Sequence, residues 1–260
     1  MHRFYADSAS PSGDSFFLSP EDTLHAAKVL RMRPGDRAEV IFRGTRWLAR
    51  ITQISDHLAE LCPSEELPST EPKLSVTLFQ GLPKSDKMDW IVQKATELGA
   101  VRIVPVAFSR CVVRLNEKEG AKKQERWQKI AREAGKQSGR CVIPEVTAPV
   151  PFRKLQDLFS SCGCVAVPWE ECGEGGPLAF HGRHPGLSSA GIVIGPEGGI
   201  SPDEIREMAG WGAEPVTLGK RILRTETAGL AALSVFFGLY GEMELLQYAD
   251  CRVPHPGLQG

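Results

Sequence analysis

Two short segments of this chain, residues 165–167 and 191–194, contain no polar side chain. A strand of this kind must be covered on both faces, as happens in a parallel sheet that carries helices on each side. Elsewhere after residue 72, apolar residues recur at helical spacing, as at Met88, Ile91 and Ala95. We expect further strands at 74–79, 103–106 and 216–218, and helices over 85–98, around 127–134, from 201 and over 228–240. This alternation predicts an α/β domain with a mostly parallel sheet.

The first 62 residues have a different pattern. Segments 38–42 and 47–51 flank residues 43–46, which predict a hairpin turn, and segment 57–62 alternates apolar and polar residues. These three strands indicate a small barrel or sheet, preceded by a helix that starts at residues 19–22. Segment 63–72 is rich in Pro, Ser and Glu and has almost nothing to bury. We therefore expect two domains, residues 1–70 and 73–247.

Composition narrows the classes of protein. The net charge of −1 excludes a globally basic nucleic-acid binder but leaves local patches open. No apolar run approaches the roughly 20 residues that a membrane span needs, and the first residues lack the apolar core of a signal peptide. Seven cysteines, an odd number in a chain of this length, indicate reduced thiols. We expect a cytoplasmic protein without a membrane partner.

A metal site also has to be considered. Cys162, Cys164, Cys172, His181 and His184 lie close together in the sequence. No Cys-x-x-Cys pair is present among them, although paired cysteines of that spacing are typical of structural zinc sites. We therefore expect no metal.

The segment 194–201 reads Ile-Gly-Pro-Glu-Gly-Gly-Ile-Ser, an apolar strand that runs into a glycine-rich turn. A capping box with proline at the first helical position follows, over residues 201–204. Ligands of α/β sheets lie beyond the carboxyl ends of strands, and glycines let backbone N–H groups approach them closely. The spacing matches neither a Walker loop nor a dinucleotide fingerprint. A ligand-binding turn and a plain tight connection are both compatible with this segment.

A second loop, residues 218–228, has a similar character. Lys220, Arg221 and Arg224 precede an apolar helix. Cations at a helix N-terminus oppose the helix dipole, so they do not stabilise that helix, but together with its free N–H groups they favour an anion. A solvated basic turn is the alternative. Glu170 follows a third strand, and three such strand ends at one edge of a sheet would form one pocket.

Two stretches of the chain are locally basic. Residues 24–50 hold seven Lys and Arg against two acidic residues, and residues 102–140 hold eleven against four. Such concentrations suit a phosphate backbone, although a solvated helix face explains much of 118–132 equally well.

With these two loops the chain resembles the bacterial RsmE family, which comprises ribosomal RNA small-subunit methyltransferases of the SPOUT superfamily that make N3-methyluridine. The resemblance rests on the two loops together, residues 194–199 and Leu-Gly-x-Arg-Ile-Leu-Arg-Thr-Glu-Thr-Ala at 218–228. Further matching segments are 2–5, 25–31, 80–84, 87–99 and 133–140. The resemblance covers about residues 2–240 and leaves 171–186 and 241–260 unmatched.

The resemblance implies an N-terminal PUA-like RNA-binding β-barrel and a C-terminal SPOUT α/β domain with a parallel sheet and a deep trefoil knot. It also implies S-adenosylmethionine as cofactor, 16S ribosomal RNA or the small ribosomal subunit as partner, and a homodimer whose interface the apolar helix 228–240 suits. Two rival functions stay open. One is a SPOUT enzyme that acts on another RNA position, and the other is a non-catalytic RNA-binding assembly protein.

The implied roles can be carried onto residues of this sequence. Arg224, and after it Arg221, would stabilise the negative charge that develops on the uracil ring when N3 loses its proton. Either Glu197 or Glu226 would accept that proton. The cofactor would contact Val167, Pro168, Glu170, Ile194, Gly195, Pro196, Glu197, Gly198, Gly199, Leu218, Gly219, Ile222, Leu223, Thr225 and Ala228. RNA would lie across Arg3, Tyr5, Lys28, Arg31, Arg33, Lys84, Arg110, Lys136 and Arg140.

Overall fold

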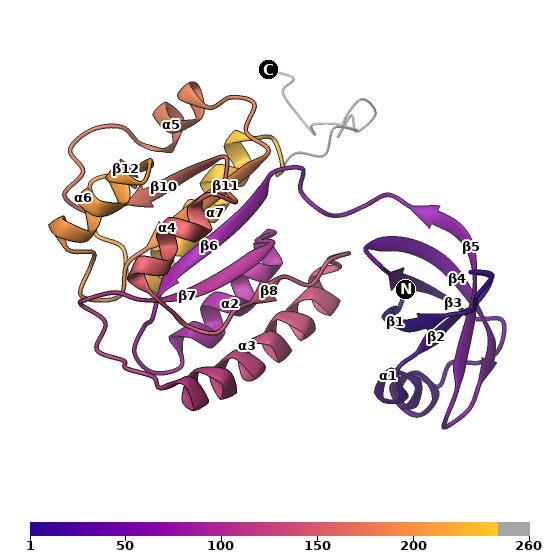
Figure 1. Cartoon of the computed structure of the whole chain (residues 1–260). Helices are drawn as coiled ribbons and strands as arrows, with labels where there is room; N and C mark the ends of the chain where they lie inside the picture. Colours follow the sequence, from indigo (N-terminus) through magenta and orange to yellow (C-terminus); the bar gives the residue numbers. More distant parts are fainter. Residues whose placement is uncertain (244–260) are drawn as a thin grey trace, which may run out of the picture.

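A computed structural model of the chain describes residues 1–243 (Figure 1). Its first part is a closed β-barrel, and its second part is a parallel sheet flanked by helices. The expected combination of a β-barrel and an α/β domain with a parallel sheet is confirmed. Figure 1 shows the barrel beside the α/β part, next to the end of helix α3 (Glu117–Ser138).

The barrel closes in the order β1-β2-β5-β4-β3. Its strands are β1 (Arg3–Ala9), β2 (Phe16–Leu18), β3 (Arg37–Phe42), β4 (Thr45–Ile54) and β5 (Ala59–Leu67). The hairpin between β3 and β4 turns on Arg43 and Gly44 alone, both with positive φ (49° and 82°), as a two-residue turn requires. Closure buries Phe4, Val40 and Leu61 at 2% exposure or less.

The predicted helix at the start of this part is confirmed, in a modified form. The side chain of Ser19 accepts a hydrogen bond from the Asp22 amide (3.2 Å) and caps α1 (Pro20–Leu24). The chain then continues as a π-helical turn, η1 (His25–Val29).

The expected linker is too long. β5 runs to Leu67 and occupies the first half of segment 63–72, because the long strand β4 offers it backbone partners, such as Ala49 for Pro63 and Trp47 for Glu66. Backbone pairing thus makes a strand of a sequence that has little to bury. Only residues 68–74 connect the two parts. The last four residues of the expected second domain, 244–247, lie outside the described residues.

The sheet of the α/β part has the strand order β12-β10-β11-β6-β7-β8, with β9 paired to β7. All pairings are parallel. The strands are β6 (Ser75–Gly81), β7 (Arg102–Ala107), β8 (Glu145–Val146), β9 (Val150–Pro151), β10 (Cys164–Pro168), β11 (Ser189–Ile194) and β12 (Ala213–Val216). The strand expected at 216–218 ends at Val216, so residues 217 and 218 belong to the following loop.

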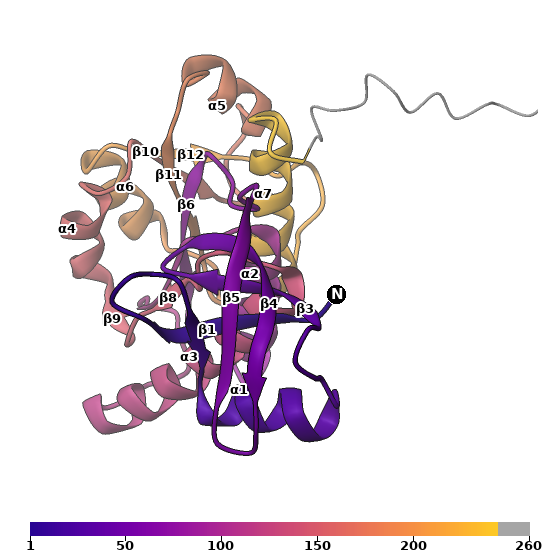
Figure 2. The ribbon, with the colours of Figure 1, turned by 90° about the vertical axis from the view of Figure 1, so that its right-hand side faces the viewer.

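Helices cover both faces of this sheet. Figure 2 shows α4 (Leu155–Phe159) and α6 (Pro202–Gly210) on one side, and α2 (Lys87–Leu98) and α7 (Thr225–Leu239) on the other. Two more elements are η2 (Phe152–Lys154) and α5 (Pro177–Arg183), which packs on α7. The capping box predicted at Ser201 is present, with Glu204 as its second member. Within residues 1–243, no helix has both the length and the apolar character needed to cross a bilayer.

Candidate active site

The carboxyl ends of β6, β10, β11 and β12 lie at one edge of the sheet, because these neighbouring strands run parallel. The loops that follow β10, β11 and β12 enclose a cavity of about 330 Å³, which we call the edge cavity. A smaller cavity of about 80 Å³ adjoins it and shares Pro168, Glu170, Ile222, Leu223 and Ala228. Such a crevice beyond strand ends is the usual ligand position in α/β sheets.

Most residues expected to hold a cofactor line these two cavities. The edge cavity is lined by Ile194, Gly195, Pro196, Glu197, Gly199, Thr225 and the shared residues, and the smaller one adds Leu218 and Gly219. Val167 and Gly198 line neither cavity, and Val167 is only 1% exposed within the sheet. The structure therefore brings together three loops that are far apart in the sequence.

Two glycines let these loops approach one another. Gly81, at the end of β6, lies so close to the loop after β11 that a Cβ atom would be 2.5 Å from the Pro196 nitrogen. Gly199 has a left-handed φ of 71°, and a Cβ atom there would lie 2.5 Å from Oε1 of Glu170. At Gly81 only glycine fits without moving the backbone, and at Gly199 the left-handed φ would strain any other residue.

A chain of buried hydrogen bonds ties the loops to the centre of the sheet. Gln80, which is fully buried in β6, donates from Nε2 to Oγ1 of Thr225 (2.8 Å). That hydroxyl donates to the carbonyl oxygen of Gly195 (2.6 Å). Thr225 begins α7 and is 5% exposed, so one side chain connects β6, the loop after β11 and the first turn of α7.

An ion-pair cluster stands at the side of the edge cavity. Nζ of Lys87 lies 3.0 Å from Oε1 of Glu197 and 3.1 Å from Oε2 of Glu226. The amide of Lys84 also donates to Glu197 (3.0 Å). Glu197 lines the cavity, whereas Glu226 does not, although Lys87 joins the two.

The two carboxylates of this cluster are held ionised. Burial would raise the pKa of Glu197, but hydrogen bonds from Lys87 and the backbone outweigh it and lower that pKa below its ordinary value. The same balance lowers the pKa of Glu226, where backbone and Lys87 hydrogen bonds prevail over burial. Hydrogen bonds to Glu197 and then Glu226 raise the pKa of Lys87 in return.

Two arginines border the cavities without an internal partner. Arg224 lines the edge cavity and Arg221 the smaller one, and both residues are exposed. Neither guanidinium forms an ion pair with another residue between 1 and 243. Their charge is therefore available to an anionic group at this edge.

Sequence reasoning missed Lys87, Gln80 and Trp169 as site residues. Lys87 carried the same signal as the 220–224 cations, since it is a cation at the start of a helix that follows a strand. Gln80 is a polar residue that follows the apolar pair Leu78 and Phe79 in β6, and such residues are buried only where they have partners. Trp169, which lines the smaller cavity, gave no comparable signal.

The residues expected to bind RNA fall into three separate groups. Lys28, Arg31 and Arg33 are exposed on the barrel, with Lys28 paired to Asp56 (2.9 Å). Lys84 and Arg110 are exposed beside the edge cavity, where Arg110 donates to the carbonyl oxygen of Gly198 (3.2 Å). Arg3, Tyr5, Lys136 and Arg140 lie where the barrel meets α3.

The side chains of the third group form hydrogen bonds and ion pairs with other residues of the protein. The phenol of Tyr5 donates to the carbonyl oxygen of Arg140 (2.5 Å), Lys136 pairs with Asp22 (2.9 Å), and Arg3 pairs with Glu39 (2.7 Å). Burial raises the pKa of Tyr5 well above its ordinary value. The contacts of Tyr5 and Lys136 hold the barrel against the α/β part, whereas the Arg3–Glu39 pair lies within the barrel. A contact of these side chains with RNA would first require these bonds to break.

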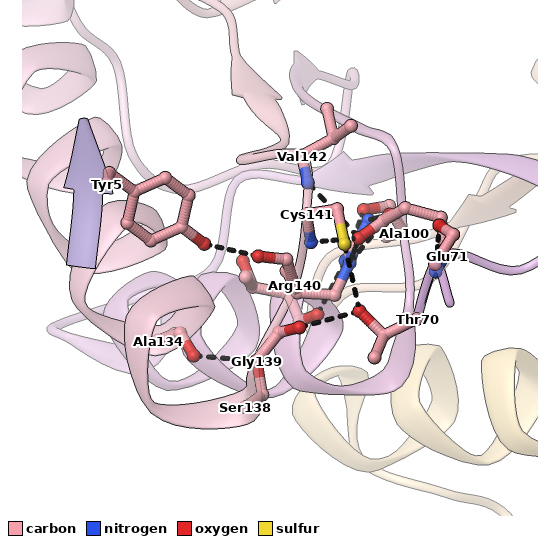
Figure 3. A network of polar contacts seen from close by, with 12 residues as sticks. Tyr5, Thr70, Glu71, Ala100, Ala134, Ser138, Gly139, Arg140, Cys141 and Val142 are labelled. Atoms are coloured by element: carbon pink, nitrogen blue, oxygen red, sulfur yellow. Dashed lines mark hydrogen bonds and ion pairs between the residues drawn. The ribbon is translucent and has the colours of Figure 1, made fainter. Parts of the chain in front are cut away.

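Arg140 is the clearest correction among the expected RNA contacts (Figure 3). It is 3% exposed, its Nη1 donates to the carbonyl oxygens of Thr96 (2.7 Å) and Ala100 (3.0 Å), and its Nε and Nη2 bind the carboxylate of Glu71. Glu71 also accepts from the Cys141 amide (2.6 Å). A guanidinium with this set of partners is structural, and the expectation that it contacts RNA is wrong.

The cysteines and histidines between 162 and 184 do not converge. Cys172 donates to the carbonyl oxygen of Glu174, His181 stacks edge-on against Tyr240, and only Cys164 and His184 touch. Within residues 1–243, no three His, Cys, Asp or Glu side chains are grouped as a metal site would need.

Comparison with known families gives two matches. A family described as an RNA methyltransferase domain matches residues 70–237, and one described as an RNA methyltransferase PUA domain matches residues 18–61. The first contains all three loops of the edge cavity, and the second lies in the barrel.

Individual relatives agree with these matches. Ribosomal RNA small subunit methyltransferase E of Bacillus subtilis is 36% identical over 85% of this chain and 88% of the relative. The protein of the same name from Mycobacterium bovis is 32% identical over 88% of each chain. A crystal structure of ribosomal RNA small subunit methyltransferase E from Neisseria gonorrhoeae, bound to S-adenosyl methionine, superposes with a TM-score of 0.79 at 34% identity and covers 92% of this chain and 98% of that one.

Proposed function

This chain belongs to the ribosomal RNA small subunit methyltransferase E (RsmE) family, and from that premise we propose that it methylates N3 of a uridine in 16S ribosomal RNA with S-adenosylmethionine as methyl donor. The observation that carries the proposal is the edge cavity, where three loops meet around glycines, carboxylates and two arginines that have no ion pair within residues 1–243. The cavity lies where the α/β architecture places ligands.

The residues present fit this cofactor. Ile222, Leu223 and Ala228 offer an apolar wall shared by both cavities, which suits the flat face of adenine. The backbone of residues 194–199 and 218–223 would hold its polar groups, and Gly199 leaves space that a side chain would fill. When bound, S-adenosylmethionine supplies an activated methyl group.

The chain's own task is to orient the uridine and manage its charge. Loss of the N3 proton places negative charge on the uracil oxygens, and Arg224 would stabilise that charge as it develops, with Arg221 beside it. Glu197 is the better placed of the two proton acceptors, because it lines the cavity. Glu226 would act through Lys87, to which it is paired.

RNA would approach over the two exposed cationic groups. Lys84 and Arg110 flank the edge cavity, and Lys28, Arg31 and Arg33 lie on the barrel. Phosphate contacts from both would fix the RNA while the target base enters the cavity. Binding should weaken steeply with salt, because each such contact releases counterions.

We also propose that the protein is a homodimer with a trefoil knot. α7 leaves apolar residues such as Leu230 and Val235 partly or fully exposed, and Trp90 of the neighbouring α2 is 51% exposed. A face of this kind suits a second copy of the chain. Support for the knot comes from the path of the chain. After the edge strand β12, the chain returns to the centre of the sheet, where the Thr225 hydroxyl donates to the carbonyl oxygen of Gly195.

We also propose a domain boundary and a cellular location. We place the division between the RNA-binding barrel and the catalytic domain near residues 70–73, in the connection after β5. A cytoplasmic location is proposed because the substrate is ribosomal RNA.

The test is methyl transfer from labelled S-adenosylmethionine to 16S RNA and to small subunits, followed by mass spectrometry of the nucleosides. We expect N3-methyluridine, and we expect Arg224→Ala to abolish it. Another methylated nucleoside would indicate a SPOUT enzyme with a different target. Absence of cofactor binding in calorimetry would favour the non-catalytic RNA-binding protein.

A further inference from the structure

A second polar cluster lies away from the edge cavity, at the start of β10. Sγ of Cys164 is 3.2 Å from Nδ1 of His184, and Nε2 of His184 is 2.6 Å from Oε1 of Glu214. Nε and Nη2 of Arg183 donate to the other oxygen of Glu214 (3.0 and 2.6 Å). None of these side chains lines either cavity of the candidate active site.

The fold places these groups together from three elements. Ala166 of β10 pairs with Glu214 of β12, and Cys164 lies two residues before Ala166, so the side chains of Cys164 and Glu214 share one face of the sheet. His184 follows α5, which Phe180 anchors to the core at 0% exposure. The backbone at His184 is further held because Tyr240 donates to its carbonyl oxygen (2.7 Å).

The order of the contacts defines their chemistry. The neutral tautomer that serves both neighbours of His184 carries its proton on Nε2, donates it to Glu214 and accepts the thiol proton of Cys164 at Nδ1. This is the connectivity of a nucleophile, a base and a group that orients the base. Because the imidazole separates the thiol from the carboxylate, the three cannot converge on one metal ion.

The resting state of the thiol is neutral. Burial, and after it the charge of Glu214, raise the pKa of Cys164. The sulfur would therefore become nucleophilic only as His184 removes its proton. Glu214 would stabilise the imidazolium that forms, and its own pKa stays low, since hydrogen bonds from Arg183 and His184 outweigh its burial.

We propose that Cys164 is a modification site that reacts with small disulfides by thiol–disulfide exchange, with His184 as general base. In this step the Sγ–H proton moves to Nδ1 of His184, Sγ bonds to one sulfur of the reagent, and the reagent's S–S bond breaks. The departing thiolate then takes the proton from His184, so one disulfide is replaced by a mixed disulfide and one free thiol.

Access favours a small reagent. Cys164 is partly exposed at the sheet edge opposite the cofactor cavity, so a small molecule reaches it without entering the active site. Arg183, whose side chain is 50% exposed, is paired to Glu214, which the imidazole of His184 separates from the sulfur. The site is independent of methyl transfer, and Cys164→Ser should leave that activity unchanged.

The experiment exposes the full chain to oxidised glutathione and follows each cysteine by peptide mass spectrometry. Cys62 is the internal control, since it is exposed on the barrel and, within residues 1–243, its sulfur has one hydrogen-bond partner, the carbonyl oxygen of Pro63 (3.7 Å). We expect Cys164 to react at least about tenfold faster than Cys62 at neutral pH. This acceleration is smaller than that of the strongest general bases, because a thiol ionises readily in water even without a base.

Two variants test the role of the base. His184→Gln should lower the Cys164 rate at least about tenfold and leave the Cys62 rate unchanged, and Glu214→Gln should lower it less. A Cys164 rate no faster than that of Cys62, or one that His184→Gln leaves unchanged, would overturn the proposal.

Discussion

Replacing Thr225 with valine tests whether the buried hydrogen-bond chain shapes the edge cavity. Valine has nearly the same shape as threonine, so the change removes the hydroxyl and little else. The hydroxyl accepts from Gln80 (2.8 Å) and donates to Gly195 (2.6 Å). After substitution, Nε2 of Gln80 keeps one partner, the carbonyl oxygen of Gly81 (3.1 Å), in a position with 0% exposure.

The cost follows from these environments. The amide of Gln80 cannot reach water, so its lost bond should cost about 1–3 kcal/mol. The carbonyl of Gly195 borders the cavity and can be hydrated, so its lost bond should cost about 1 kcal/mol. Together the free energy of unfolding should fall by about 2–4 kcal/mol. Because the loops after β11 and β12 lose their common anchor, the affinity for S-adenosylmethionine should fall about tenfold or more.

Urea denaturation followed by tryptophan fluorescence measures the stability, and isothermal calorimetry measures cofactor binding. Thr225→Ser is the matched control, since it retains the hydroxyl, and it should bind the cofactor almost normally. A Thr225→Val protein within about 0.5 kcal/mol of the unaltered one, with unchanged affinity, would refute the reasoning.

Three further predictions concern charge. Arg224→Ala should lower single-turnover methyl transfer by about 10²-fold or more and change cofactor affinity little, whereas unchanged turnover would remove Arg224 from its role. Lys87→Met removes the ammonium that holds the pKa of Glu197 below 4.5, so that pKa should rise and the acid limb of the pH–rate profile should move to higher pH. The ion pair between Lys87 and Glu197 stabilises the fold above pH 4.5, and this stabilisation is lost as the pH falls through the lowered pKa of Glu197. Lys87→Met should therefore make the free energy of unfolding less dependent on pH between 4.5 and that lowered pKa. Arg140→Met leaves the carboxylate of Glu71 without its cation, so the free energy of unfolding, measured by heat or urea, should fall by about 3–5 kcal/mol. A fall of less than about 1 kcal/mol would contradict a structural role.

The α/β architecture and the meeting of the loops could be predicted from general rules. Apolar strands such as 191–194 require a covered parallel sheet, and parallel strands present their following loops at one edge. The length of β5 could not be predicted in the same way, because Pro63 to Leu67 form a strand through backbone pairing with β4 rather than through burial. Likewise, nothing in the residues alone indicates that Gln80 in β6 reaches Thr225, which is 145 positions later.

The net charge of a sequence window was the least reliable basis for predicting RNA contacts, because several cations of this chain form ion pairs within the protein. Residues 102–140 are strongly basic by count, yet Arg102, Arg126, Lys136 and Arg140 all pair with carboxylates that lie outside that stretch. A count within a window misses these partners, because the fold supplies them from distant segments. Lys136 and Arg140 hold the barrel and its connection to α3. Among the nine residues expected to contact RNA, the exposed ones therefore lie beside the edge cavity and on the barrel. The salt dependence of RNA binding should therefore fall when Lys84 or Arg110 is replaced, and replacement of Lys136 should instead weaken the contact between the two domains.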